Sequence, residues 1–431
     1  MTAMREPRVI PRAEHTISRR DIDPDALKVL YRLRQYEHIA YLVGGSVRDL
    51  LLGRRPKDFD IGTSAHPYQV KKLFRNCWII GRRFRLAHVK FGTKVIEVAT
   101  FRRQLQPGEE TTPEAAPPSA HAAAVHHDNT FGTPEEDAFR RDFTINALFY
   151  DIATFSIIDY VNGMNDLRAG IVRSIGEPEV RFREDPVRML RAVALAARLD
   201  FTIDPPILEA IRVQRHEIAR SSAARLLEEY YKILRSGYAE KIFRALAAAG
   251  LLEPISAELH RGANDALWQS LGALDAYRAR FESVPDTFTN PVLLGSLLVP
   301  LGFTPRFSSR EPAVEDRSRS GTPSPRALGP RLGELPLARR DVERLSQILM
   351  LQRRMRDLAA NPRAQTALTH RSIFREALTW LDVHGGAPPL VDHWNAVVGQ
   401  HGQMAAEESA GDHLPRRRRR RRRRRFRPTP S

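Results

Sequence analysis

The pattern of apolar residues changes near residue 176, and this change constrains the fold more than any other feature of the sequence. Residues 22–176 mix short β-rich runs with helical spacing, whereas residues 177–305 have helical spacing almost throughout. A run of strands followed by a run of helices predicts an α+β chain. We therefore expect a small N-terminal mixed sheet with helices on one face, followed by all-helical regions.

Local spacing predicts where the secondary structure of the first region lies. Apolar runs bounded by turn residues indicate strands, and apolar residues three and four apart indicate helices. The expected strands are residues 39–43, 59–63, 78–80, 86–91, 95–101, 157–158 and 171–175. The expected helices are residues 25–36, 47–52, 67–74 and 135–148.

Two irregular stretches suggest the limits of the domains. Residues 104–130, rich in Pro, Ala and His, are expected to be a flexible insertion, and residues 306–335, rich in Pro, Ser, Arg and Gly, a flexible linker. The predicted division is an N-terminal extension (1–21), a sheet domain (22–176), a helical domain (177–305), the linker, a C-terminal helical region (336–403) and a disordered Arg-rich tail (404–431).

Several classes of protein are excluded by what the sequence lacks. Cys77 is the single cysteine, so neither an internal disulfide nor a multi-cysteine zinc site can form. The first 20 residues carry no apolar core of a signal peptide, and no apolar run is long enough to cross a membrane. We expect a cytoplasmic protein that does not insert into membranes.

The charge of the chain is concentrated at its C-terminal end. The net charge is +17, and Arg416–Arg425 with Arg427 supply eleven positive charges, so the remainder carries +6. A run of arginines binds phosphate groups without sequence preference, which predicts nucleic acid as the partner. The alternative is a solvated tail that only aids solubility.

Gly44 and Gly45 follow the predicted strand 39–43 and precede the predicted helix 47–52. Glycines at such a turn allow backbone amides to approach a phosphate closely. Arg48 adds a side chain suited to a charge-assisted contact with the same group. A phosphate-binding turn is therefore predicted, although a plain tight turn also accommodates two glycines.

Asp58 and Asp60 flank Phe59 one short helix after this turn. Residues two apart in a strand point to one face, so the two carboxylates meet while Phe59 points into the core. Mg²⁺ binds carboxylate oxygens together with substrate phosphates. An isolated Asp-x-Asp is more often a solvated strand edge, so it is the neighbouring glycine turn that favours a magnesium site.

A third acid would complete this site, and the sequence offers two. Glu97 lies on the otherwise apolar strand 95–101, and Asp142 follows Arg140 and Arg141, which add positive charge for phosphate. Either acid is also consistent with a plain surface position.

A last polar segment surrounds Pro186, which suits the first turn of a helix capped by Glu184 or Asp185. Asp185 and Arg188 are three residues apart and would share one face. An acceptor and a donor held side by side match the hydrogen-bonding edge of a base. An ordinary capped helix with an internal ion pair is the alternative.

Four motifs in this order resemble the class II nucleotidyltransferase superfamily, which contains bacterial poly(A) polymerases and CCA-adding enzymes. They are G-G-x-V-R-D from Gly44, D-x-D from Asp58, R-R-D-F-T-I-N from Arg140 and E-D-P-x-R-x-x-R from Glu184. Both branches share these motifs. The segments 80–89 and 11–19 and the Arg-rich end are similar to the poly(A) polymerase branch.

The resemblance implies roles for individual residues. Asp58 and Asp60 would be catalytic ligands of two Mg²⁺ ions, with Asp142 as the third active-site acid and Glu97 as the other candidate. Nucleotide contacts would come from Gly44, Gly45, Arg48, Arg141, Asp185, Arg188 and Arg191. In two departures from the pattern, Ser46 replaces a frequent glycine, and Ala194 replaces a frequent arginine, which removes one nucleotide contact.

We expect template-independent addition of AMP from ATP to RNA 3′ ends, with release of pyrophosphate. The catalytic domain would be residues 22–176, and residues 177–305 would bind nucleotide and RNA. RNA contacts are expected from Arg416, Arg420 and Arg425 and from the helical-domain arginines Arg191, Arg198, Arg212, Arg215, Arg220 and Arg225. By resemblance, RNA-decay machinery is an expected partner, and the chain is expected to be a monomer.

Two other functions remain open. The nearer is a CCA-adding enzyme, because Asp185 and Arg188 also match cytosine, which has an exocyclic amine beside a ring acceptor. The further is a non-catalytic RNA-binding protein, against which the presence of Asp58, Asp60 and Asp142 argues.

Overall fold

The computed structural model describes residues 6–81, 85–103, 131–304, 332–333 and 335–411, with the helical backbone alone for 401–411. The insertion 104–130, most of the linker, and Arg416, Arg420 and Arg425 lie outside these residues. One compact unit comprises Met1–Pro285, Ser296–Phe303 and Arg319–Ala338, and the other Asp286–Gly295, Thr304–Ser318 and Arg339–Ser431. The predicted limit at residue 176 falls within the first unit.

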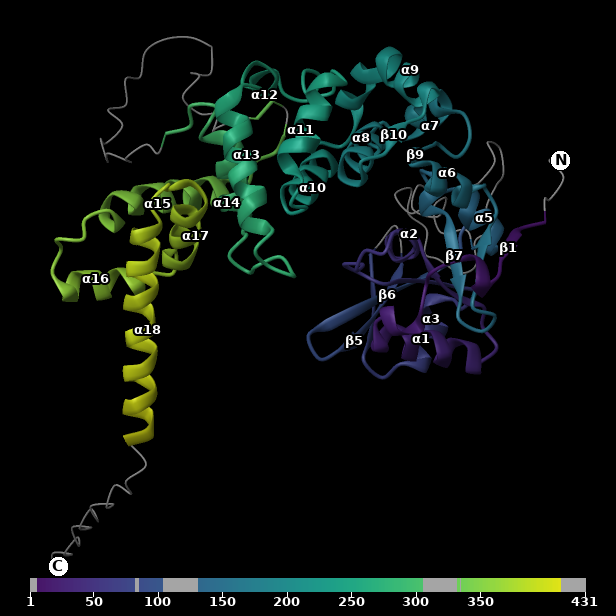
Figure 1. Cartoon of the computed structure of the whole chain (residues 1–431), viewed down its shortest axis with the longest axis horizontal. Helices are drawn as coiled ribbons and strands as arrows, with labels where there is room; N and C mark the ends of the chain where they lie inside the picture. The colour runs from purple at the N-terminus through teal and green to yellow at the C-terminus, as the bar shows by residue number, and fades with distance from the viewer. Residues whose placement is uncertain (1–5, 82–84, 104–130, 305–331, 334, 412–431) are drawn as a thin grey trace, which may run out of the picture. The chain divides into compact units, whose positions relative to one another are not determined.

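The first unit contains an eight-stranded mixed sheet with the order β1-β8-β7-β2-β3-β6-β5-β4. Its strands β5 and β6 lie side by side in Figure 1. Neighbouring strands pair antiparallel, except for the parallel pair β3–β6. The strands are β1 (Arg8–Ile10), β2 (Ala40–Val43), β3 (Asp60–Thr63), β4 (Cys77–Ile80), β5 (Leu86–Phe91), β6 (Lys94–Thr100), β7 (Leu148–Asp151) and β8 (Ser156–Asp159).

Helices α1 (Pro24–Gln35) and α3 (Pro67–Leu73) pack against this sheet and against each other. The start of α1 is fixed by its sequence, because Asp23 accepts hydrogen bonds from the backbone of Asp25 and Ala26. Its apolar face buries Ala26, Val29, Leu30 and Leu33 completely. The amphipathic spacing seen in the sequence therefore places α1 on the sheet.

The core beside the functional strands is aromatic. Phe101 and Phe149 are buried, and each meets Tyr41 at ring-centroid distances of 6.0 and 6.2 Å. The same cluster contains Val43, Ala138, Ala147, Ile158 and Ile175. It fixes the end of β2, which leads into the glycine turn, against the central strands of the sheet.

A helical region follows the sheet within the first unit. Helix α8 packs on α10 and α11, and α11 packs on α13. Strand β9 (Ile171–Val172) precedes α8 in the chain and β10 (Thr202–Ile203) follows it, and the two strands pair as a parallel two-stranded sheet. The helices are α6 (Gly163–Ala169), α7 (Pro178–Glu184), α8 (Val187–Leu199), α9 (Pro205–Gln214), α10 (Ala223–Leu234), α11 (Ala239–Ala248), α12 (Ala257–Arg261), α13 (Asp265–Arg278) and α14 (Asn290–Leu298), the last with residues of both units.

The second unit is helical in its described part. Its helices are α15 (Arg339–Met355), α16 (Pro362–Thr369), α17 (Phe374–His384) and α18 (Pro388–Gly411). The fully buried Trp394 donates its Nε1–H to the carbonyl of Met355 at 2.9 Å. In the described chain, no helix has both the length and the apolar character that a bilayer span requires.

The α+β class with a mixed N-terminal sheet is confirmed, but the predicted helix over 135–148 is wrong. Helix α5 covers only Pro134–Phe139, a 3₁₀ turn covers Thr144–Asn146, and β7 begins at Leu148. The chain leaves the helix because Phe143 forms a β-bridge with Ser174 and the amide of Thr144 bonds to Arg173. These long-range contacts override the local spacing.

Candidate active site

The glycine turn connects β2 directly to α2 (Gly45–Leu51), as its sequence predicts. Gly44 has φ of 74° and ψ of −136°, a conformation that residues with a Cβ strongly disfavour. A Cβ on Gly44 would also lie 3.1 Å from Nη1 of Arg141. Both the backbone conformation and the close approach of Arg141 therefore require glycine at this position.

Arg48 lies beneath this turn and not at its surface. Its side chain is buried, donates to the carboxylate of Asp49 at 2.8 and 2.6 Å, and donates through Nη1 to the side-chain oxygen of Asn146. Burial lowers the pKa of the Arg48 guanidinium. These contacts join the turn to the 3₁₀ turn of residues 144–146, so Arg48 supports the geometry predicted to bind phosphate.

Strand pairing brings the candidate acids next to the glycine turn. In the β2–β3 register Asp60 lies opposite Val43, the residue before Gly44. The parallel β3–β6 pairing aligns Ile61 with Val98. Asp60 and Glu97 each come one residue earlier, so they lie next to each other on neighbouring strands. Asp58 precedes the strand, and its side chain is 73% exposed. The loop before β3 and the turn after β2 thus meet at one edge of the sheet.

These acids crowd one another electrostatically. Burial raises the pKa of Asp60 to about 6, and the negative charges of Glu97 and Asp58 add to this effect. The positive charge of Arg141 opposes it. Phe59, expected in the core, is only partly buried. Of the two candidate third acids, Glu97 is therefore the one whose charge acts on Asp60.

The donor set fits a hard divalent cation. Among the described residues no three His, Cys, Asp or Glu side chains converge closely enough to enclose an ion by themselves. Two carboxylates that share a ligand shell with nucleotide phosphates are, however, the usual protein contribution to a Mg²⁺ site. The uncompensated charge around Asp60 is what such a cation would neutralise.

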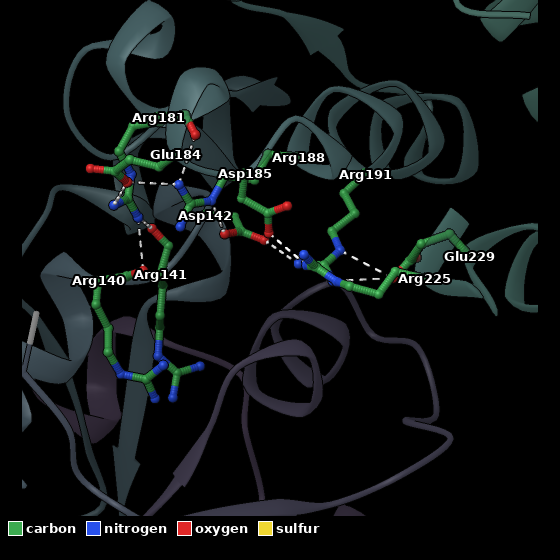
Figure 2. Close-up of polar contacts among 10 residues, drawn as sticks. All are labelled: Arg140, Arg141, Asp142, Arg181, Glu184, Asp185, Arg188, Arg191, Arg225 and Glu229. Atoms are coloured by element: carbon green, nitrogen blue, oxygen red, sulfur yellow. Dashed lines mark hydrogen bonds and ion pairs between the residues drawn. The ribbon is translucent and has the colours of Figure 1, made fainter. Parts of the chain in front are cut away.

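The carboxylate of Asp142 binds two arginines (Figure 2). Arg188 Nε donates to its Oδ1 at 2.7 Å, and Arg191 Nη1 donates to its Oδ2 at 2.9 Å. Burial alone would raise the pKa of Asp142, but the two guanidinium groups outweigh burial and lower it. Asp142 thus connects the sheet region to α8 through charge pairs.

Two side chains that the sequence interpretation missed hold Arg140 and Arg141 in place. Asp137 is buried and pairs with Arg140 at 2.5 Å and with Arg141 at 2.8 Å. Arg181, also buried, donates to the backbone carbonyls of Arg140 and Arg141 at 2.8 and 2.9 Å (Figure 2). The three- and four-residue spacing from Asp137 to the arginines was an available signal for the first.

The predicted capped helix at residues 184–188 is wrong in its details. Helix α7 ends at Glu184, and α8 begins at Val187 with Pro186 at its N-cap, where no side chain caps the helix. Asp185 pairs with Arg225 of α10 at 2.8 Å, while Arg188 pairs with Asp142. The two residues expected to share a face are therefore held by different partners.

Four of the six helical-domain arginines predicted to contact RNA are paired with acids. Arg212 and Arg220 pair with Glu209 and Glu217 on their own turns at 2.5 and 2.7 Å. Arg191 pairs with Asp142 and with Glu229. An RNA path over this region remains a prediction.

The sequence matches two family models. Residues 40–173 match the poly A polymerase head domain, and residues 200–262 match the probable RNA and SrmB-binding site of polymerase A. The first match contains the glycine turn, Asp58, Asp60, Glu97 and Asp142, and the second contains α10.

The chain is similar in sequence to two kinds of enzyme. Over 249 residues the chain is 51% identical to poly(A) polymerase I of Escherichia coli, covering 57% of this chain and 53% of that protein. It is 34% identical over 246 residues to a CCA-adding enzyme of Lactobacillus johnsonii, covering 57% and 58%. The chain spans about half the length of these relatives.

The fold also matches a solved structure. The Bacillus stearothermophilus CCA-adding enzyme in complex with CTP superposes with a TM-score of 0.58 at 28% identity, covering 88% of this chain and 83% of that one. The glycine turn and its acids fall within the part of the chain that matches the poly A polymerase head domain, and over about half of its length the chain is similar to enzymes of the nucleotidyltransferase superfamily. Within that superfamily, its identity is higher with poly(A) polymerase I, at 51%, than with the CCA-adding enzyme, at 34%.

Proposed function

We propose that this chain is a template-independent polynucleotide adenylyltransferase, which adds AMP from ATP to RNA 3′ ends and releases pyrophosphate. The observation that carries the proposal is the register of β2, β3 and β6, in which Asp60 lies beside both Glu97 and the Gly44–Gly45 turn. The 51% identity to poly(A) polymerase I over 249 residues supports ATP as the nucleotide.

In this proposal Asp58 and Asp60 hold Mg²⁺, with Glu97 as the third acid. Bound Mg²⁺ neutralises phosphate charge and lowers the pKa of the attacking 3′-hydroxyl. The amides of the glycine turn and the guanidinium of Arg141 orient the triphosphate beside the acids. The 3′-oxygen forms its bond to the α-phosphorus as the bond to the pyrophosphate oxygen breaks, so the chain contributes mainly positioning and charge.

The base of the nucleotide is assigned to the segment between α7 and α8. Asp185 accepts from an exocyclic amine, and Arg188 donates to the neighbouring ring nitrogen. Arg191 and Asp142 complete the charge network that holds Arg188 in place.

RNA is assigned to the helical region that includes residues 200–262, with the Arg-rich end adding affinity. A partner from the RNA-decay machinery and a monomeric state remain expectations.

CCA addition is the second candidate, favoured by the structural match to the CCA-adding enzyme at a TM-score of 0.58. An unstructured RNA primer and a tRNA lacking its terminus, each incubated with Mg²⁺ and one nucleotide at a time, separate the candidates on a product gel. We expect a ladder with ATP on the unstructured primer. Use of CTP with a stop after three additions to the tRNA would establish the CCA-adding function instead, and no addition with any nucleotide would refute both.

A further inference from the structure

Helix α10 carries one basic and one acidic side chain that pair with residues just before α8 and in its first half. Arg225 and Glu229 are four residues apart and so lie on one face of α10. Arg225 Nη2 donates to Asp185 Oδ2 at 2.8 Å, and Arg191 donates through Nε and Nη2 to Glu229 Oε1 at 3.2 and 3.1 Å (Figure 2). One face of α10 therefore holds both Asp185 and Arg191, two residues predicted to contact the nucleotide.

The two carboxylate oxygens of Asp185 have different surroundings. Oδ2 accepts the hydrogen bond from Arg225, whereas Oδ1 is buried and accepts no hydrogen bond from any described residue. A buried carboxylate oxygen without a donor is costly, and such atoms are rare in folded proteins unless a ligand or water satisfies them. Oδ1 is thus an acceptor that a ligand would satisfy.

We propose that Arg225 is a positioning residue that sets base selectivity, because it holds Oδ2 of Asp185 and so directs Oδ1 to the exocyclic amine of the incoming base. This inference rests on the proposed adenylyltransferase function and deepens it. Because Oδ1 is buried, nucleotide binding must expose it, and Arg225 fixes the carboxylate as this happens. Without Arg225 the carboxylate rotates freely, and its preference for an amine donor is lost.

The position of Arg225 suits this role better than a purely structural one. Its side chain is 46% exposed, while that of Asp185 is 18% exposed, so the arginine reaches inward from the surface to its partner. An ion pair at such an exposed position contributes little to stability. Its removal should therefore change the orientation of Asp185 more than the folding of the chain.

The test compares ATP with purine riboside triphosphate, which carries hydrogen in place of the exocyclic amine. The measured quantity is the ratio of kcat/KM for the two nucleotides, on the full chain with an RNA primer and Mg²⁺. The variants are Arg225→Met, which removes the donor, and Arg225→Lys, which keeps a charged one. The matched control is Arg183→Met, because Arg183 is 63% exposed and pairs with Glu179 at 3.4 Å.

We expect the parent and the Arg183→Met variant to prefer ATP by about tenfold or more, the effect of one hydrogen bond to a charged group. In Arg225→Met the preference should fall to within about threefold through lower kcat/KM for ATP alone, and Arg225→Lys should restore part of it. A general structural defect would lower kcat/KM equally for both nucleotides and leave the ratio unchanged.

Thermal unfolding verifies that each variant is folded. If Arg225→Met does not fold, Arg225→Gln, which removes the charge and shortens the side chain, is judged by the same ratio. A folded variant that keeps the parental preference for ATP overturns the assignment of Arg225 while the proposed function stands. A parent chain that adds no nucleotide to any primer overturns the proposed function itself.

Discussion

At the scale of single residues, the buried acids of the site fall into two groups, according to whether paired arginines lower their pKa. The pKa of Asp142 is lowered by Arg188 and Arg191 despite burial, and that of Asp137 by Arg141 and Arg140 despite burial. The pKa of Asp60 is instead raised to about 6 by burial and by Glu97 and Asp58. Such a separation among neighbouring acids is typical of functional sites, and it points to Asp60 as the centre of this one.

The two candidates for the third acid are separable by substitution. We expect Glu97→Gln to fold normally, since Glu97 is 50% exposed, but to lose transfer activity by a factor of about 100 or more. Asp142→Asn should instead destabilise the chain by about 1.5–3 kcal/mol, because it removes the negative charge that binds Arg188 and Arg191, although Glu184 and Glu229 still pair with these arginines. Urea unfolding and primer extension measure both effects. Full activity in folded Glu97→Gln would exclude it as the third acid.

A histidine in the second unit makes stability depend on pH. His384 stacks on Trp380 with ring centroids 4.2 Å apart, and burial lowers its pKa to about 4. The unfolded chain, with a pKa near 6.5, binds more protons between these values, so stability should fall as the pH drops from about 6.5 towards 4. His384→Gln should lessen that fall, by at most about 2 kcal/mol at pH 5. Unfolding curves of both proteins at pH 7 and pH 5 test this, and parallel losses would contradict it.

At the scale of elements, local sequence explains the β2–turn–α2 unit but not the charge network. Strand β5 (Leu86–Phe91) has the predicted bounds, and the glycine turn was predicted because its residues are adjacent in the chain. Asp142 meets Arg191 across 49 residues, and Asp185 meets Arg225 across 40. No local spacing encodes these partners. Other long-range contacts, from Phe143 to Ser174 and from Thr144 to Arg173, replace the predicted helix over 135–148 by an irregular segment.

The glycine turn is testable with a matched pair of glycines. Gly44→Ala and Gly53→Ala both place an alanine at positive φ, 74° and 66°, and each should lose about 1–3 kcal/mol of stability. The new Cβ meets Arg141 at Gly44 but nothing within 4 Å at Gly53. We therefore expect only Gly44→Ala to lose transfer activity in primer extension. Equal activity in the two variants would show that the turn does not position the nucleotide.

At the scale of the whole molecule, most of the net positive charge lies in a different part of the sequence from the proposed catalytic residues. The acids and their arginines belong to the first unit, whereas eleven of the arginines lie within Arg416–Arg427. We therefore propose that the first unit determines which nucleotide is added, and we expect the arginine run to contribute affinity for RNA that does not depend on sequence.

Replacing Arg416–Arg425 by serine separates these contributions. Each phosphate contact with single-stranded RNA contributes about −0.7 to the slope of log affinity against log salt, so the slope should become less steep by about 3 or more. The rate of addition at saturating primer should stay within about twofold of the parent, because the site is unchanged. RNA-binding titrations at several salt concentrations test this, and an unchanged slope would remove the run from the RNA interface.

We propose that Asp58 and Asp60, beside the glycine turn, carry the transfer chemistry. The most direct measurement is primer extension with ATP and Mg²⁺ by the Asp58→Ala/Asp60→Ala variant, together with its affinity for the same RNA. Asp392→Ala, which removes an exposed acid of α18, is the control. We predict RNA affinity equal to that of the parent and no detectable addition. Addition near the parental rate would contradict the account.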